Sequence, residues 1–132
     1  MIISFAQSKG GTTKSTLAAN FATWLQLKGH DVASLDLDAG EFGNQSLAAM
    51  LADHTANVCQ PESPAHLRQL LCELTEQYPF IVADAPGGFQ HTRDMNIELL
   101  RHTDFALIPV KPELGDIEPL LVVEQIVDEA KK

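Results

Sequence analysis

The chain has 132 residues, of which 45% are hydrophobic and 20% are charged. These fractions are typical of a globular domain, and they exclude disordered, collagen-like and low-complexity classes. Eighteen Asp and Glu residues outnumber nine Lys and Arg residues, which gives a formal net charge of −9. That charge excludes a broad basic surface for nucleic acid, so any phosphate site is expected to be local.

Neither a membrane span nor secretion is predicted. The chain has no apolar run of about 18 residues, and its N-terminus lacks the basic start and apolar stretch of a signal peptide. The two cysteines, Cys59 and Cys72, show no CxxC spacing. This favours free thiols in a reducing cytoplasm, and a disulfide is the weaker alternative.

Apolar runs bounded by turn residues alternate with helical patterns along the whole chain. Strands are predicted at residues 1–6, 31–37, 79–83 and 104–110, with a short one at 57–60. Helices are predicted at residues 14–28, 44–53, 64–77, 92–101 and 116–132. The alternation predicts an α/β fold, in which a mostly parallel β-sheet is flanked by helices in a single domain over residues 1–132. The continuous apolar runs at 80–83 and 105–110 are expected to be buried on both faces.

A phosphate-binding loop is predicted between the first strand and the first helix, in the segment SKGGTTKST (residues 8–16). Gly10 and Gly11 lack β-carbons, so their amides can wrap an oxyanion, and the helix N-terminus adds further donors. Lys14 can reach the β- and γ-phosphates, and the Ser15 hydroxyl suits Mg²⁺. The predicted nucleotide-binding residues are Lys9, Gly10, Gly11, Thr12, Thr13, Lys14, Ser15 and Thr16.

Acidic residues lie at the ends of two of the predicted strands. Alternation along the second strand places Asp36 and Asp38 on the same side, at the carboxyl end where α/β sheets bind ligands. Asp84 follows the apolar run at 80–83, which is the Walker B form, in which the carboxylate holds Mg²⁺ and a glycine amide just beyond it can meet the γ-phosphate. Each segment alone also fits an ordinary turn or a solvated loop, but their order along the chain makes coincidence improbable.

The pattern K-G-G-x-x-K-[ST] resembles the deviant Walker A box of the ParA and MinD group of P-loop NTPases. The general pattern G-x-x-x-x-G-K-[ST] fails here, because Ser8 and Thr13 stand where it has glycine. Lys9 matches the signature lysine of the group. Thr13 is the unexpected departure, since its position is expected to need φ > 0, where a β-branched residue is strained by about 1 to 3 kcal/mol.

The resemblance implies roles for individual residues. Lys9, Lys14 and Asp38 would be catalytic, with Lys9 reaching the nucleotide of a dimer partner and Asp38 supporting the attacking water. Ser15, Asp36 and Asp84 would lie around Mg²⁺. The implied cofactors are ATP or ADP together with Mg²⁺.

The function implied by this resemblance is a cytoplasmic, Mg-ATP-dependent ATPase switch that dimerises and helps to partition or position DNA or other cargo. A stimulating partner protein is expected, and DNA binding by this chain is expected to be weak or absent. The alternatives are a nucleotide-binding or partner-binding module that does not hydrolyse ATP, and a small-molecule kinase, for which no substrate motif is found. Family domains usually continue with further strands and helices, so the chain is either a truncated version or an unusually short form.

Overall fold

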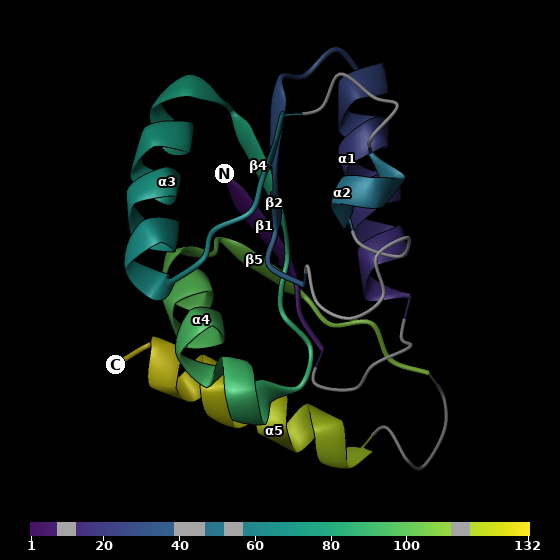
Figure 1. The fold of residues 1–132 in the computed structure, drawn as a ribbon. Helices are drawn as coiled ribbons and strands as arrows, with labels where there is room; N and C mark the ends of the chain where they lie inside the picture. Colours follow the sequence, from purple (N-terminus) through teal and green to yellow (C-terminus); the bar gives the residue numbers. More distant parts are fainter. Residues whose placement is uncertain (8–12, 39–46, 52–56, 112–116) are drawn as a thin grey trace.

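The computed structural model describes residues 1–7, 13–38, 47–51, 57–111 and 117–132 (Figure 1). Strands and helices alternate along these residues. The strands are β1 (Ile2–Phe5), β2 (Val32–Asp36), β3 (Asn57–Cys59), β4 (Phe80–Asp84) and β5 (Phe105–Leu107). The helices are α1 (Lys14–Leu27), α2 (Leu47–Met50), α3 (Pro64–Gln77), α4 (Phe89–His102) and α5 (Ile117–Ala130).

The strands described form one five-stranded sheet in the order β3-β2-β4-β1-β5, and every neighbouring pair is parallel. Ser4 of β1 pairs with Ala83 of β4 and with Ala106 of β5, so β1 lies inside the sheet. Asp36 and Asp84 are register partners at the carboxyl ends of β2 and β4. The predicted α/β fold with a parallel sheet is confirmed, and both acidic strand ends meet at one edge.

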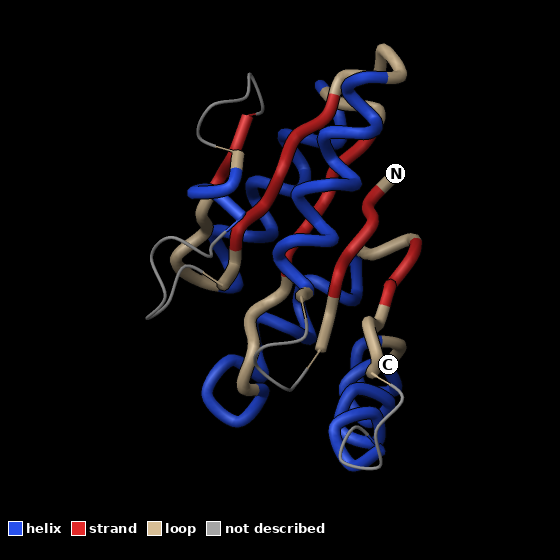
Figure 2. The backbone as a smooth tube through the Cα atoms, turned by 90° about the vertical axis from the view of Figure 1, so that its right-hand side faces the viewer, coloured by secondary structure: helices blue, strands red, loops and turns tan. Residues whose placement is uncertain are grey.

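Helices cover both faces of the sheet (Figures 1 and 2). On one face, α1 and α2 pack through Ala18, Ala22 and Leu47 against buried side chains of β1, β2 and β4. On the other face, Leu67 and Leu71 of α3 pack with Leu99 of α4. Helix α5 packs on α4 through a smaller cluster that contains Val123, Ile126, Ile97 and Leu100. The two apolar layers hold β1, β2 and β4 in the middle of the molecule.

The helix α3 shows why a local prediction succeeds. Ser63 accepts a hydrogen bond from the His66 amide at 3.1 Å and so caps the helix, while Pro64 occupies the first turn, where no amide donor is needed. The predicted bounds of 64–77 are those observed. In contrast, α4 begins at Phe89, three residues before the predicted start at 92, because Gly88 caps it in the left-handed region with φ 66°.

The expectation that the run 105–110 is buried on both faces is wrong. Strand β5 ends at Leu107, and all three of its residues are exposed; Phe105 is 57% exposed and Leu107 is 43% exposed. The physical reason is position, since β5 is the edge strand of the described sheet and an apolar composition does not by itself distinguish edge from centre. The run 80–83 of β4 fits the expectation better, with Ile81, Val82 and Ala83 fully buried.

Other predicted elements agree with the structure within a few residues. The helix predicted at 44–53 is represented by α2, and residues 44–46 and 52–53 lie outside the described part. The helix predicted at 116–132 is α5, which begins at Ile117. Among the residues described, no helix combines the length and apolar character needed to cross a bilayer.

Candidate phosphate-binding site

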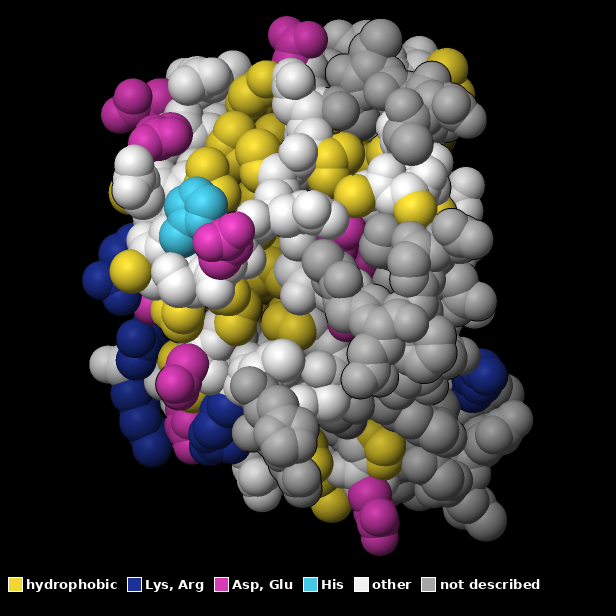
Figure 3. Space-filling model, in the orientation of Figure 1, with side chains coloured by type: hydrophobic (Ala, Val, Ile, Leu, Met, Phe, Trp, Pro, Cys, Tyr) yellow, Lys and Arg dark blue, Asp and Glu magenta, His cyan; other side chains and the backbone are white. Residues whose placement is uncertain are grey.

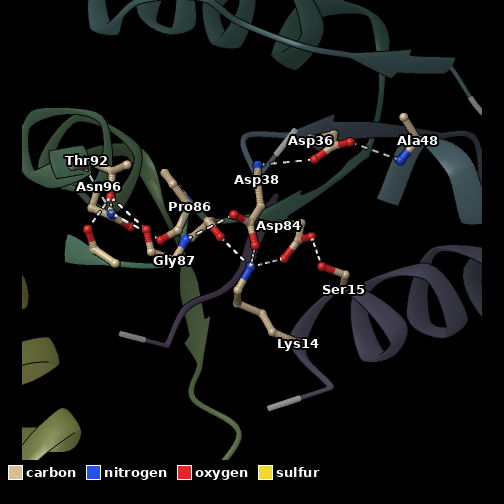
Figure 4. Close-up of polar contacts among 12 residues, drawn as sticks. Lys14, Ser15, Asp36, Asp38, Ala48, Asp84, Pro86, Gly87, Thr92 and Asn96 are labelled. Atoms are coloured by element: carbon tan, nitrogen blue, oxygen red, sulfur yellow. Dashed lines mark hydrogen bonds and ion pairs between the residues drawn. The ribbon is translucent and has the colours of Figure 1, made fainter. Parts of the chain in front are cut away.

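Lys14 lies at the centre of the site, where α1 begins at the carboxyl edge of the sheet. The side chain is only 6% exposed. Its ammonium donates to Oδ1 of Asp84 at 2.5 Å, to Oδ2 of Asp38 at 3.1 Å and to the carbonyl of Ala85 at 2.5 Å (Figure 4). Three acceptors match the three protons of an ammonium, so the buried charge is fully satisfied.

The end of β4 provides the most buried carboxylate of the site. Asp84 is fully buried, and its Oδ2 accepts a hydrogen bond from the Ser15 hydroxyl. Burial raises the pKa of the Asp84 carboxyl above its usual value, and the nearby Lys14 ammonium and Ser15 hydroxyl oppose that rise. The predicted Walker B residue therefore meets both predicted P-loop side chains.

The two acids at the carboxyl end of β2, Asp36 and Asp38, have different surroundings. Asp38 accepts from Lys14 and, through Oδ1, from the Gly87 amide at 3.3 Å. Asp36 is buried and points away from Lys14 (Figure 4). Its oxygens accept from the Asp38 amide at 3.1 Å, the Ala48 amide at 3.1 Å and the Gln60 side chain at 3.2 Å.

Asp36 therefore has a structural role, because its carboxylate links the segment after β2 to the start of α2 through hydrogen bonds. Asp36 and Asp38 both lie at the carboxyl edge of the sheet. The Asp38 side chain contacts Lys14, whereas the Asp36 side chain points towards Ala48 (Figure 4). The assignment of Asp36 to the surroundings of Mg²⁺ stays a prediction.

Part of the predicted loop falls outside the described residues, namely Lys9, Gly10, Gly11 and Thr12. Thr13 is described, and its φ of 60° and ψ of 14° confirm the expectation of a left-handed backbone there. Thr16 is exposed, and its carbonyl accepts from Asn20 within α1. Its side chain is not among the groups that converge on Lys14.

Three contributors to the site were missed in the sequence. The Ala85 carbonyl is a backbone group, and no residue type predicts it. Thr92 and Asn96 of α4 hydrogen-bond to the loop that follows Asp84. One signal in the sequence could have predicted these two residues. They are polar, and they stand four positions apart near the start of a helix that follows Pro86-Gly87-Gly88.

The oxygen atoms gathered here suit a magnesium ion. Mg²⁺ prefers oxygen ligands and is usually bound through one or two carboxylates together with substrate phosphates. The Ser15 hydroxyl and the Asp84 carboxylate are in direct contact, and Asp38 shares the Lys14 ammonium with Asp84. The donor set therefore fits Mg²⁺ held beside a phosphate.

A match to a protein-family model shows the family of this chain. The model called CbiA, which describes the CobQ/CobB/MinD/ParA nucleotide-binding domain, matches residues 3–127. The chain belongs to this family. The predicted resemblance to ParA and MinD is thereby confirmed, and with it a nucleotide-binding domain whose family includes partition and division ATPases. No curated protein sequence gave a significant match.

Solved structures share the fold at low sequence identity. Chloroplast FtsY from Physcomitrella patens superposes with a TM-score of 0.73 at 15% identity, over 95% of this chain and 46% of its own. A plasmid partition protein from Borrelia burgdorferi bound to AMPPNP has a TM-score of 0.69 at 21% identity, over 99% of this chain and 69% of its own. The MinD cell division protein from Aquifex aeolicus has a TM-score of 0.67 at 20% identity, over 97% of this chain and 65% of its own. The present family member thus spans about half to two thirds of the length of these chains.

Proposed function

We propose that this family member is a Mg-ATP-dependent switch of the ParA type, which dimerises with bound ATP and hydrolyses it slowly. The observation that carries the proposal is the convergence of Lys14, Ser15, Asp84 and Asp38 at one edge of the sheet. In this proposal the protein acts in the cytoplasm and serves the partition or positioning of DNA or another cargo.

Each side chain of the site has a distinct task in this proposal. The Lys14 ammonium lies at the start of α1, where the phosphates would bind. When nucleotide binds, Lys14 donates to oxygens of the β- and γ-phosphates in place of its present carboxylate and carbonyl acceptors. Ser15 and Asp84 hold Mg²⁺, which when bound supplies neutralisation of phosphate charge. Asp38, which is 38% exposed, remains accessible to water and orients the attacking molecule.

Lys9 is proposed to act across a dimer. By the family resemblance it reaches the nucleotide of the partner, where a cation in a water-poor interface stabilises the developing charge of phosphoryl transfer. The homodimer and the stimulating partner protein both belong to this proposal. A weak basal rate is expected, because the complete set of charges is assembled only in the dimer.

Calorimetry with ATP and Mg²⁺ tests the central claim. Lys14→Ala removes the cation at the predicted phosphate position, so ATP affinity is expected to fall at least tenfold. Lys28→Ala is the matched control, because Lys28 lies exposed at the opposite end of α1 and is expected to leave affinity unchanged. Equal ATP affinity in the wild-type protein and Lys14→Ala overturns the proposal.

The second candidate is a module that binds nucleotide without hydrolysing it. The left-handed Thr13 beside Lys14 favours this candidate, because a strained, non-glycine residue at this position is a departure from the usual loop. Phosphate release by the purified chain with Mg-ATP separates the two candidates. If the wild-type chain releases phosphate and Lys14→Ala does not, the ATPase is supported. If the wild-type chain binds ATP and releases no phosphate, the binding module is supported.

A further inference from the structure

The first turns of α4 carry two polar side chains that face the loop after β4 (Figure 4). Thr92 has φ −120° and ψ 16°, which interrupts the helical backbone. Asn96 lies four residues further along and is fully buried. Thr92 therefore marks the start of the regular part of α4, and Asn96 lies about one turn further along it.

These two side chains hold consecutive carbonyls of that loop. The Asn96 amide nitrogen donates to the Pro86 carbonyl at 3.3 Å and to the Thr92 hydroxyl at 3.1 Å. The Thr92 hydroxyl in turn donates to the Gly87 carbonyl at 3.2 Å, with the Gly88 carbonyl at 3.4 Å. The loop is thus fixed by a short chain of hydrogen bonds that ends in the buried Asn96.

The loop that is held in this way reaches the centre of the site. The Gly87 amide donates to Oδ1 of Asp38 at 3.3 Å, and the other oxygen of Asp38 accepts from Lys14 at 3.1 Å. A Cβ on Gly87 would lie 3.9 Å from both Asp38 oxygens, so the backbone of Gly87 is close to the carboxylate. Any shift of the carbonyls of Pro86 and Gly87 therefore moves an amide beside the proposed phosphate position.

Asn96 is not an obvious choice for stability alone. Its Oδ1 is buried, and no donor in the described part of the chain reaches it. A buried acceptor without a partner costs free energy, whereas an apolar side chain of similar size avoids that cost. The donor side of the same amide, which binds Pro86 and Thr92, gives a physical reason for asparagine at this position.

We propose that Thr92 and Asn96 are positioning residues that set where the Gly87 amide meets the terminal phosphate of a bound nucleoside triphosphate. The inference rests on the proposed function and deepens it, because it assigns discrimination between triphosphate and diphosphate to α4. A diphosphate lacks the group that this amide would contact. The pair therefore affects triphosphate affinity and leaves diphosphate affinity unchanged.

Calorimetry with Mg-AMPPNP and with Mg-ADP tests the inference. Thr92→Val removes the hydroxyl at nearly constant volume, and it is expected to weaken AMPPNP binding roughly five- to tenfold while ADP affinity stays within about twofold. Thr92→Ser keeps the hydroxyl and is expected to restore AMPPNP affinity. Thr75→Val is the matched control, because the Thr75 hydroxyl bonds to Leu71 and Cys72 within α3, away from the site.

Asn96→Leu provides a second variant, and cooperative thermal unfolding of each protein shows that it is folded. The same selective loss for AMPPNP is expected from Asn96→Leu. Equal losses for AMPPNP and ADP, unchanged AMPPNP affinity in both variants, or a failure of Thr92→Ser to restore binding overturns the inference alone. A wild-type protein that binds neither nucleotide overturns the proposed function, and the inference falls with it.

Discussion

At the scale of single residues, the site is arranged around one buried cation. Lys14 is flanked by the carboxylates of Asp84 and Asp38, and the pKa of the Asp84 carboxyl is raised by burial in spite of its proximity to Lys14. A phosphate that approaches the ammonium must therefore replace acceptors that are already well placed. In the proposed function, the charge of Lys14 is therefore held near the phosphate position before nucleotide binds.

Asp38→Ala is predicted to separate binding from hydrolysis. If Asp38 orients water and does not hold the nucleotide, phosphate release falls about 100-fold or more, while ATP affinity changes little. Asp94→Ala is the charge-matched control, since Asp94 lies exposed on α4. Parallel loss of affinity and of phosphate release in Asp38→Ala would assign Asp38 to nucleotide binding instead.

Thr13→Gly is predicted to relieve the strain of a β-branched residue at φ 60°. Such a residue costs about 1 to 3 kcal/mol, and part of that is recovered even after the greater freedom of glycine in the unfolded chain is subtracted. ATP affinity or the rate of phosphate release is expected to rise. Thr13→Ala serves as the control, because it shortens the side chain without removing the Cβ. A fall in both quantities for Thr13→Gly would show that threonine is an adaptation of this loop.

At the scale of the elements, Glu98 joins α3 to α4 from a buried position. It accepts two hydrogen bonds from the Arg68 guanidinium, at 2.7 and 2.9 Å, and one contact at 3.1 Å from His102. Arg101 lies 3.9 Å away. The Arg68 hydrogen bond, followed by that of His102 and by both charges, lowers the pKa of Glu98 from 4.5 to about 2 despite its burial.

This shift predicts a pH dependence of stability. Because the folded protein holds Glu98 ionised more strongly than the unfolded chain does, the contribution is fully present above about pH 4.5 and is lost as the pH falls towards about 2. Glu98→Gln is expected to lower the free energy of unfolding by about 1 to 2 kcal/mol at pH 7, a modest value because Arg68 is largely exposed. In urea titrations of both proteins from pH 7 to pH 2, the difference in the free energy of unfolding should shrink below about pH 4.5 and largely disappear at the acidic end. A constant difference across that range would contradict the assignment.

At the scale of the whole molecule, several basic side chains of the described residues are compensated by acids. Figure 3 shows Lys and Arg side chains along one edge of the visible face, with Asp and Glu side chains among them. Arg68 and Arg101 lie beside Glu98, Arg93 pairs with Glu129, and Lys131 pairs with Asp128. With a net charge of −9, these pairs leave little positive potential to attract phosphate backbones.

Weak binding of duplex DNA by this chain is therefore predicted, both without nucleotide and with Mg-ATP. Non-specific affinity depends on the number of phosphates neutralised, and it is about 10⁻⁴ to 10⁻⁶ M even for typical DNA-binding proteins. A mobility-shift titration at about 0.1 M salt is expected to show no complex at micromolar protein. Tight binding with Mg-ATP that weakens steeply as salt rises would instead reveal a basic surface assembled by a dimer.

Local signals in the sequence determined the helices and strands, and they determined the order along the chain of the segments that form the site. Ser63 and Pro64 marked the start of α3, the apolar run before Asp84 marked β4, and Lys14 with Ser15 marked the start of α1. These features depend on neighbouring residues, because caps, turns and the period of apolar positions act over a few residues of chain. The parallel fold followed from their alternation, which restricts how such elements can pack.

Tertiary structure alone decided which of the predicted groups meet. Asp36 and Asp38 have the same residue type and the same side of the strand end, yet only Asp38 reaches Lys14, because the start of α2 and Gln60 provide donors to Asp36. The Ala85 carbonyl, the buried Asn96 and the exposure of β5 likewise depend on segments distant in sequence. Hydrogen-bond partners and edge positions are set by the approach of remote segments, and the pattern of residue types within one segment does not encode that approach.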